Sequence, residues 1–229
     1  MEGNPQDKQQ RQPQPQQEKL ATPESNKQGG QSSARGQTAK GDSSTQLKSE
    51  SPSGPKTFIA EKTEIVGRVT FGDNCIVHPL CSIIAEGGDI HIGEYNIIEE
   101  KVKIINRLKK DENGQPVKRK MIIGSYNVFE VYSTIESTDI GDMNEFQHRC
   151  AIIDSRVDNY CQINPAVTVS RGTHLESYSV VYDDGKIRKN QEPNEEAKKV
   201  GIKELCAFLS EQLPKHNKAR VVQQPAESK

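Results

Sequence analysis

The stretch IVGRVTFGDNCIVHPLCSII, residues 65–84, places a large apolar side chain at every sixth position, namely Ile65, Phe71, Val77 and Ile83. A period of six matches neither an amphipathic helix, with a period of 3.6, nor a half-buried strand, with a period of two. Repetition at a short fixed period is typical of solenoids, in which each repeat packs on its neighbours. The spacing of six holds within five runs, which are separated by steps of nine, nineteen, five and five residues. The runs comprise nineteen positions: Ile59, Ile65, Phe71, Val77, Ile83, Ile92, Ile98, Ile104, Ile123, Phe129, Ile135, Ile140, Phe146, Ile152, Val157, Ile163, Val169, Leu175 and Val181.

A second pattern marks the turns of this solenoid. Glycine directly follows the large residue in the segments that begin at Phe71, Ile92, Ile123 and Ile140, and asparagine closes each segment. Three hexapeptides make about 18 residues, so the series predicts about six turns of a three-sided coil of parallel strands. Small residues are expected inside the corners, and Gly or Asn in the bends, where the backbone needs positive φ.

We therefore predict an all-β fold for residues 57–190, a parallel β-helix interrupted by an excursion at 106–121. From 57 to 186 there are eighteen Ile and twelve Val against three Leu, an excess of β-branched side chains that suits strands. The periodicity is that of hexapeptide-repeat proteins, and the left-handed sense of the coil is taken from this resemblance. General crossover rules favour the right hand.

The segments on either side of the coil differ from it in composition. Residues 1–56 contain eleven Gln and no aromatic residue, which predicts a disordered Gln/Ser/Pro-rich tail. In residues 191–229 we predict one amphipathic helix at about 194–213, with Asn194 as N-cap and Pro214 as terminator, and then a frayed tail. The apolar residues expected to pack this helix are Ala197, Val200, Leu205, Phe208, Leu209 and Leu213.

Charge and cysteine content favour a soluble protein of a reducing compartment. The net charge is -1, and no stretch approaches the roughly 20 apolar residues that cross a bilayer. The five cysteines are odd in number and show no CxxC spacing, which argues against a disulfide framework. Cys75, Cys81, Cys150 and Cys161 each follow a stacked residue by four positions and are predicted to be small buried side chains.

A search for catalytic chemistry yields no catalytic, cofactor or metal site. A zinc centre of the carbonic anhydrase type needs three converging histidines, but the five histidines do not cluster in the predicted coil. An acyltransferase needs only a general base, for which His78 is the candidate, although an outward side chain beside Pro79 is the simpler interpretation. The histidines are His78, His91, His148, His174 and His216.

The excursion is the one local concentration of charge in the sequence. Asn113 and Gly114 predict a tight bend, with basic residues on both arms. Docking onto an acidic protein surface is the functional hypothesis, and a flexible solubilising loop is the alternative. Nucleic acid is disfavoured, because no aromatic residues interleave the charges. The candidate partner-binding residues are Arg107, Lys109, Lys110, Lys118, Arg119 and Lys120.

The stretch GRVTFGDNCIVHPLCSIIAEGGDIHIGEYNIIEEKVKIIN (67–106), the insertion and MIIGSYNVFEV (121–131) together resemble the pointed-end subunits of dynactin, a hexapeptide-repeat family. The resemblance implies a non-enzymatic structural subunit without cofactor. Its implied partners are dynactin subunit 5, the actin-related and zinc-containing subunits and, indirectly, dynein, but neither nucleic acid nor a membrane. The implied location is cytoplasmic, on the microtubule cytoskeleton, with the centrosome and kinetochore as candidate sites. The alternative function is a homotrimeric acyltransferase or γ-class carbonic anhydrase.

Overall fold

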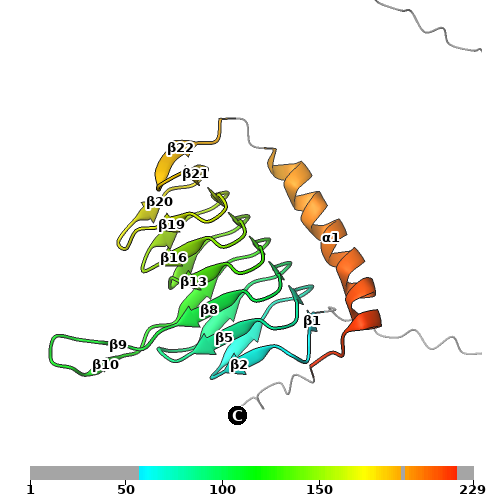
Figure 1. Ribbon diagram of the computed structural model, residues 1–229, viewed down its shortest axis with the longest axis horizontal. Coiled ribbons are helices and arrows are strands. Elements are labelled where there is room, and N and C mark those ends of the chain that lie inside the picture. Colours follow the sequence, from blue (N-terminus) through cyan, green and yellow to red (C-terminus); the bar gives the residue numbers. More distant parts are fainter. Residues whose placement is uncertain (1–56, 192–193, 221–229) are drawn as a thin grey trace, which may run out of the picture. The chain divides into compact units, whose positions relative to one another are not determined.

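The computed structural model describes residues 57–191 and 194–220, and its strands wind into a three-sided coil (Figure 1). We name its sheets I, II and III in the order in which the chain first enters them. Sheet I contains β1 (Phe58–Ile59), β4 (Ile76–Val77), β7 (Ile97–Ile98), β12 (Val128–Phe129), β15 (Glu145–Phe146), β18 (Gln162–Ile163), β21 (Ser179–Tyr182) and β22 (Lys186–Lys189).

Sheets II and III have six strands each. Sheet II contains β2 (Glu64–Val66), β5 (Ser82–Ala85), β8 (Lys103–Asn106), β13 (Thr134–Glu136), β16 (Ala151–Ile153) and β19 (Thr168–Val169). Sheet III contains β3 (Val69–Phe71), β6 (Ile90–Ile92), β11 (Met121–Ile123), β14 (Asp139–Ile140), β17 (Arg156–Val157) and β20 (His174–Leu175).

The predicted interior is confirmed, because seventeen of the nineteen repeat residues are buried in one hydrophobic cluster inside the coil, and the other two, Ile65 and Phe71, are partly buried and pack against it. Strand pairing stacks them turn on turn, as in the column Ile65, Ile83 and Ile104. Phe129 and Phe146 stack with ring centroids 4.8 Å apart. The coil makes about seven turns rather than the predicted six or so, because sheet I has parallel strands at both ends of the coil.

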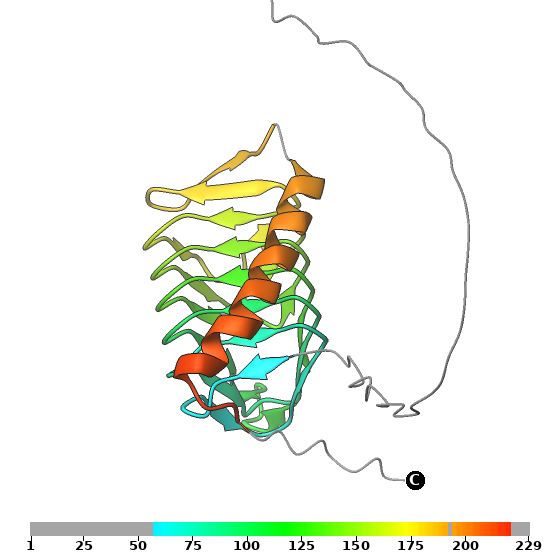
Figure 2. The same ribbon diagram turned by 90° about the vertical axis from the view of Figure 1, so that its right-hand side faces the viewer.

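The coil is left-handed, as the resemblance to hexapeptide-repeat proteins implied. Figure 2 looks at sheet I from outside, with helix α1 (Glu195–His216) in front. In that view the strands of sheet I run from right to left while the chain climbs from β1 to β21, which is the left-handed sense.

The bends between sheets III and I differ from the prediction. They adopt positive φ, and Asn74, with φ of 57°, fits the prediction in the first of them. Large residues occupy later ones: Tyr95, Tyr126 and Tyr160 have φ of 53°, 60° and 59°. Stacking between turns offsets the strain of this conformation, since the rings of Tyr95 and Tyr126 lie 5.0 Å apart and nearly parallel. The asparagines that follow the first two, Asn96 and Asn127, point into the corner and are fully buried.

Helix α1 begins as predicted and ends later. The Asn194 side chain accepts a hydrogen bond from the Ala197 backbone N–H, as an N-cap does. Pro214 does not terminate the helix, which continues to His216. A proline in the last turn removes only one backbone donor, and the Asn217 N–H closes the turn on the Leu213 carbonyl.

The predicted packing face of α1 is wrong for four of its six residues. Ile202 and Cys206 are the buried residues of α1, with Leu209 and Leu213 packed partly beside them. These four recur at helical spacing and cover the part of sheet I where Ile76 and Ile97 point outward. The remaining predicted contacts are exposed: Ala197, Val200, Leu205 and Phe208.

The segment after α1 is ordered through Arg220, contrary to the predicted frayed tail. Ala219 forms an antiparallel bridge with Ala60, and the Arg220 N–H donates to the Ile59 carbonyl at 2.7 Å. At the other end of sheet I, β22 pairs antiparallel with β21. The chain thus covers both ends of sheet I with its own backbone. The predictions for residues 1–56 and 221–229 lie outside the described residues.

Candidate interaction surfaces

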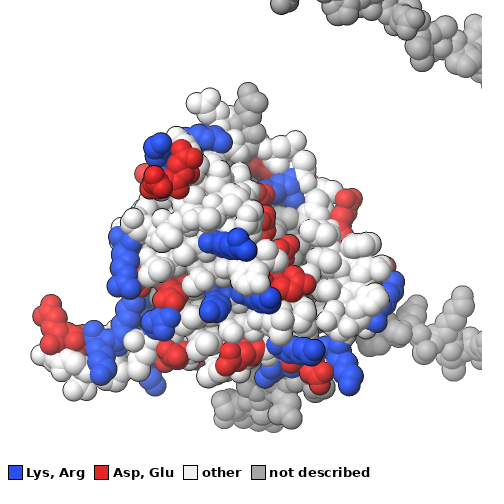
Figure 3. Space-filling view, viewed as in Figure 1, with Lys and Arg blue, Asp and Glu red and all other residues white. Residues whose placement is uncertain are grey.

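The basic excursion is a β-hairpin clamped onto the coil. Its arms, β9 (Lys109–Lys110) and β10 (Pro116–Val117), pair antiparallel, as the bend at residues 113–114 predicted. Lys109 forms an ion pair with Asp154, which lies two turns further along the coil. Arg119 forms another with Asp139. Figure 3 shows acidic and basic side chains together on this hairpin, at the lower left.

Arg107 makes the ion pair with the best-defined geometry between the hairpin and the coil. Its guanidinium binds both carboxylate oxygens of Glu136, with Nε–Oε2 and Nη2–Oε1 distances of 2.8 and 2.5 Å. This bidentate hydrogen bond lowers the pKa of Glu136 and raises that of Arg107. Three of the six candidate residues therefore hold the hairpin in place. The other three, Lys110, Lys118 and Lys120, are exposed and make no ion pair within the described part of the chain.

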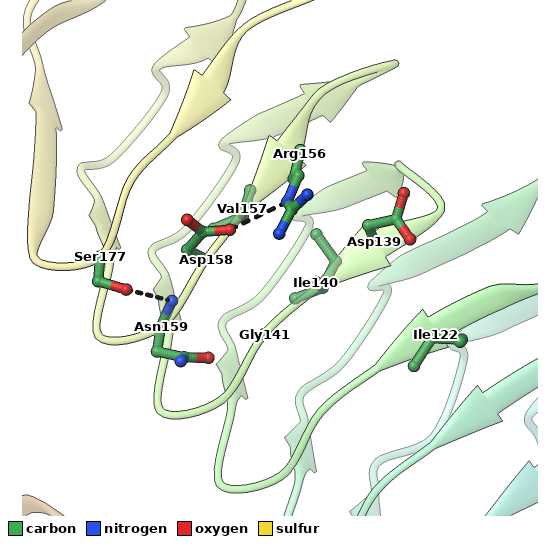
Figure 4. Close-up of a pocket in the computed structure, with 9 residues that line it drawn as sticks. All are labelled: Ile122, Asp139, Ile140, Gly141, Arg156, Val157, Asp158, Asn159 and Ser177. Atoms are coloured by element: carbon green, nitrogen blue, oxygen red, sulfur yellow. Dashed lines mark hydrogen bonds and ion pairs between the residues drawn. The ribbon is translucent and has the colours of Figure 1, made fainter.

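Sheet III carries an open groove of about 490 Å³ on its outer side (Figure 4). Ile122, 54% exposed, forms its apolar end, and the Arg156 guanidinium spans its middle. Asp158 accepts hydrogen bonds from Arg156 at 3.0 Å and from His174 at 2.9 Å. Although burial opposes the shift, these bonds leave the pKa of Asp158 below its usual value. The groove offers charged groups that already have partners, together with one exposed aliphatic side chain.

The histidines lie apart and engage different side chains. Among residues 57–191 and 194–220, no three metal-ligating side chains are grouped to hold an ion. The candidate acyltransferase base, His78, is mostly buried against Glu100, with 3.0 Å between Nδ1 and Oε1. The contacts in the coil are His78 with Glu100, His91 with Thr70, His148 with Glu130, and His174 with Asp158.

The four cysteines that each follow a stacked residue by four positions are buried inside the corners, as predicted. Burial raises the pKa of Cys75 to about 11 and those of Cys81 and Cys150 to about 12. A thiol that stays protonated in this way behaves as a small hydrophobe instead of a nucleophile.

The groove on sheet III was not predicted from the sequence. Its lining side chains alternate with the inward residues, and outward positions such as Ile122 and Arg156 follow no repeat of their own. The only available signal was that a β-branched aliphatic residue stands at an outward position of a three-residue strand, β11. In the described residues, no helix has the length and hydropathy needed to cross a bilayer.

The geometry and the periodic interior define the class: the protein is a left-handed β-helix of hexapeptide repeats with a packed C-terminal helix. No family model matches the sequence. Individual relatives do. A dynactin subunit 6 of Nematostella vectensis is 36% identical over 141 residues, which cover 60% of this chain and 77% of that one. A dynactin subunit 6 of Danio rerio is 35% identical and covers 58% and 70%. The chain belongs to the dynactin subunit 6 family.

More distant similarities exist to enzymes of this class. A carbonic anhydrase of Methanosarcina thermophila is 24% identical over 144 residues, covering 56% of this chain and 58% of the enzyme. The crystal structure of a UDP-N-acetylglucosamine acyltransferase from Bacteroides fragilis matches with a TM-score of 0.42 and 12% identity, covering 73% of this chain and 86% of that one. A structural match this weak carries no argument about activity.

Proposed function

We propose that this chain is a non-enzymatic subunit of a dynactin complex, located in the pointed-end subcomplex, where it supports dynein-driven transport and cargo attachment along microtubules. The observation that carries the proposal is the 36% identity to a dynactin subunit 6 over 77% of that protein's length. The architecture fits such a role, because a rigid coil presents flat outer walls to which other proteins can bind. The proposed partners are dynactin subunit 5 and the actin-related and zinc-containing subunits.

The test is affinity purification of the full tagged chain from its own cells at near-physiological salt. Recovery of actin-related, subunit 5 and dynein chains in fixed proportion is expected. Recovery of the chain alone would contradict the proposal. Localisation by fluorescence should follow microtubules, with the centrosome and kinetochore as the finer proposed sites.

The enzyme alternative predicts a different assembly. An acyltransferase or carbonic anhydrase of this fold would be a homotrimer with sites between identical subunits, whereas the adaptor is expected to be monomeric when purified alone. The 24% identity to a carbonic anhydrase is what favours this alternative. Mass determination on the purified chain separates the two, and a stable homotrimer that hydrates CO₂ or acylates an acceptor would overturn the adaptor role.

We further propose that the exposed lysines of the hairpin contact an acidic surface within that complex. Lys110, Lys118 and Lys120 are available for this, because their three basic neighbours are already paired with the coil. Replacing all three by Glu is expected to lower recovery of the partners at least tenfold. Arg188→Glu, an exposed change of the same sign on β22, is the matched control. Equal recovery from both variants would exclude the hairpin as a contact.

A further inference from the structure

The outer surface of sheet II carries three parallel tracks of side chains that run along the coil axis. In the first, strand register stacks Val66 on Ile84 and Ile84 on Ile105, and then Glu136 on Ile153. The second contains mostly short side chains, and the third follows the corner between sheets I and II. We call the three together the sheet II face. The second track is Glu64, Ser82, Lys103, Thr134, Ala151 and Thr168, and the third is Leu80, Lys101, Tyr132 and Arg149.

The corner track presents large side chains to solvent. Leu80 is 51% exposed and Tyr132 is 49% exposed. Lys101 Nζ lies 2.7 Å from the Tyr132 hydroxyl and 4.8 Å from its ring centroid, and Arg149 lies over the same ring at 5.8 Å. Tyrosine and arginine are the residue types that most often dominate binding energy at protein interfaces. Their stacking here restricts both side chains before a partner arrives.

Sheet I shows how this coil binds a helix. Its outward residues Ile76 and Ile97 are fully buried beneath α1, which contacts them through Ile202 and neighbouring residues. Where the outer track of sheet I becomes polar, at Glu145, the helix supplies Lys198 at 3.0 Å. On sheet I, therefore, the apolar stripe of α1 packs on the outward aliphatic residues, and Lys198 of the helix pairs with the carboxylate of Glu145 beyond them.

No helix of the described residues packs on the sheet II face. Its first track is only partly open, because Val66 is 45% exposed and Ile84 and Ile153 are half-buried, whereas Ile105 is already buried.

The charge of the second and third tracks of the sheet II face is mainly positive. Lys101, Lys103 and Arg149 are the cations of these tracks. They outnumber the one carboxylate there, Glu64, which accepts a hydrogen bond from the Ser82 hydroxyl at 2.9 Å. The carboxylate of Glu136 is neutralised by Arg107. Figure 3 shows basic groups over the middle of the coil, with acidic groups beside some of them. A helix that binds here therefore needs acidic residues beside its apolar stripe.

We propose that the sheet II face binds an acidic amphipathic helix of another subunit, which lies along the coil axis as α1 lies on sheet I. From β2 to β16 there are four strand spacings of about 4.8 Å, or roughly 19 Å. At 1.5 Å per residue, a helix of about 13 residues spans this length. The inference rests on the proposed assembly role only in that the partner is another chain of the complex.

Other occupants match the face less well. A second copy docked through the same face would bring Lys103 and Arg149 against the same cations. Residues 1–56 offer Leu20 and Leu47 as their only large aliphatic side chains, with eight Lys/Arg against six Asp/Glu. Neither the same face of a second copy nor residues 1–56 provide an apolar stripe flanked by acidic residues.

The experiment is photocrosslinking in the complete complex. A p-benzoylphenylalanine is placed at Thr134, in the centre of the face, or at the exposed Ile122 of sheet III as a control, and adducts are mapped by mass spectrometry. We expect adducts from position 134 only, to one segment of another subunit with net negative charge and apolar residues at helical spacing. The double change Lys103→Glu and Arg149→Glu should lower the yield at least tenfold, and Arg188→Glu should not.

Several outcomes would overturn the proposal: adducts with residues 1–56, with a second copy or with a basic segment, or equal yields from both positions. Circular dichroism melts of the variants exclude misfolding as the cause of a lost adduct. Before any crosslinking, purification with the unsubstituted chain must show whether the complex assembles. If the complex assembles and position 134 gives no adduct, only this inference fails, whereas absence of any complex counts against the proposed function.

Discussion

The Oδ1 atom of Asn96 accepts two hydrogen bonds from Asn127 on the next turn, one from its backbone N–H at 2.9 Å and one from its side-chain amide at 3.0 Å. On the following turn, the Oδ1 atom of Asn127 accepts one hydrogen bond, from the Asn144 backbone N–H at 2.9 Å. The three asparagines are completely buried. They form a ladder that satisfies corner backbone donors that the strand pairing leaves out.

Asn127→Ala is expected to destabilise the coil by about 2–3 kcal/mol, because it leaves the buried Asn144 N–H without an acceptor and removes packed atoms. Urea unfolding followed by circular dichroism measures the loss. Asn113→Ala, at the exposed hairpin bend, is the matched control and should change the unfolding free energy by less than about 0.5 kcal/mol. Similar losses in both variants would mean that the ladder contributes little.

The glycines that mark the turns are required by close stacking and not by backbone conformation. A Cβ at Gly124 would lie 2.6 Å from the carbonyl oxygen of Gly141 on the next turn. Gly124→Ala must separate the turns locally and should cost about 1–3 kcal/mol. In Gly201→Ala the new methyl meets no atom of the described residues within 4 Å, and better helix propensity should stabilise α1 by about 0.5–1 kcal/mol. Thermal unfolding should therefore shift in opposite directions, and a stabilised Gly124→Ala would refute the stacking argument.

The interior of the coil could be predicted from the sequence because the same requirement, one large inward side chain per hexapeptide, recurs on each of its three faces. Every sixth side chain must point inward, so residues as distant as Ile59 and Val181 obey the same rule. The buried face of α1 could not be predicted in the same way, because the helix has two apolar faces. Ile202 and Cys206 are buried, and Leu205 and Phe208 are exposed. Only the complementary side chains on sheet I decide between the two faces, and the helix sequence does not contain them.

The hairpin and the bends show a second limit. The pairing of Lys109 with Asp154 joins residues 45 positions apart, and no period in the sequence relates them. The tyrosines at positive φ broke a rule of local propensity because stacking between turns outweighs it. Contacts that recur in every turn of the coil could therefore be predicted from the sequence, whereas contacts that occur once between particular turns could not.

The cysteines should differ in their accessibility to alkylation. Because burial raises the pKa of Cys75 to about 11 and that of Cys81 to about 12, both stay protonated and unreactive at pH 8 in the folded protein. Cys206 is also buried, but it lies on α1 itself, at the contact with sheet I. We expect this one helix to detach before the coil opens. Iodoacetamide labelling with mass spectrometry in rising urea should modify Cys206 before Cys75 and Cys81. Simultaneous modification of all three would show that α1 and the coil unfold together.

The Arg107–Glu136 pair should make stability depend on pH on the acidic side. The hydrogen bond to Arg107 lowers the pKa of Glu136 in the folded state below its ordinary value of 4.5, so the unfolded chain takes up this proton first as the pH falls. The contribution is complete above pH 4.5 and is lost as the pH falls through the lower folded-state value. Because the Arg107 side chain is 54% exposed, it should amount to about 0.5–1 kcal/mol.

Glu136→Gln is expected to remove this part of the pH dependence. Unfolding free energies measured by urea titration at intervals from pH 6 to 3 should fall less steeply with acid in the variant than in the parent. Glu112→Gln removes a carboxylate at the exposed hairpin tip that makes no ion pair among the described residues, and it should keep the parental slope. Because Arg107 holds the base of the hairpin, Glu136→Gln should also increase amide exchange of Lys109 and Val117 within β9 and β10. An unchanged slope together with unchanged exchange would show that the ion pair does not anchor the hairpin.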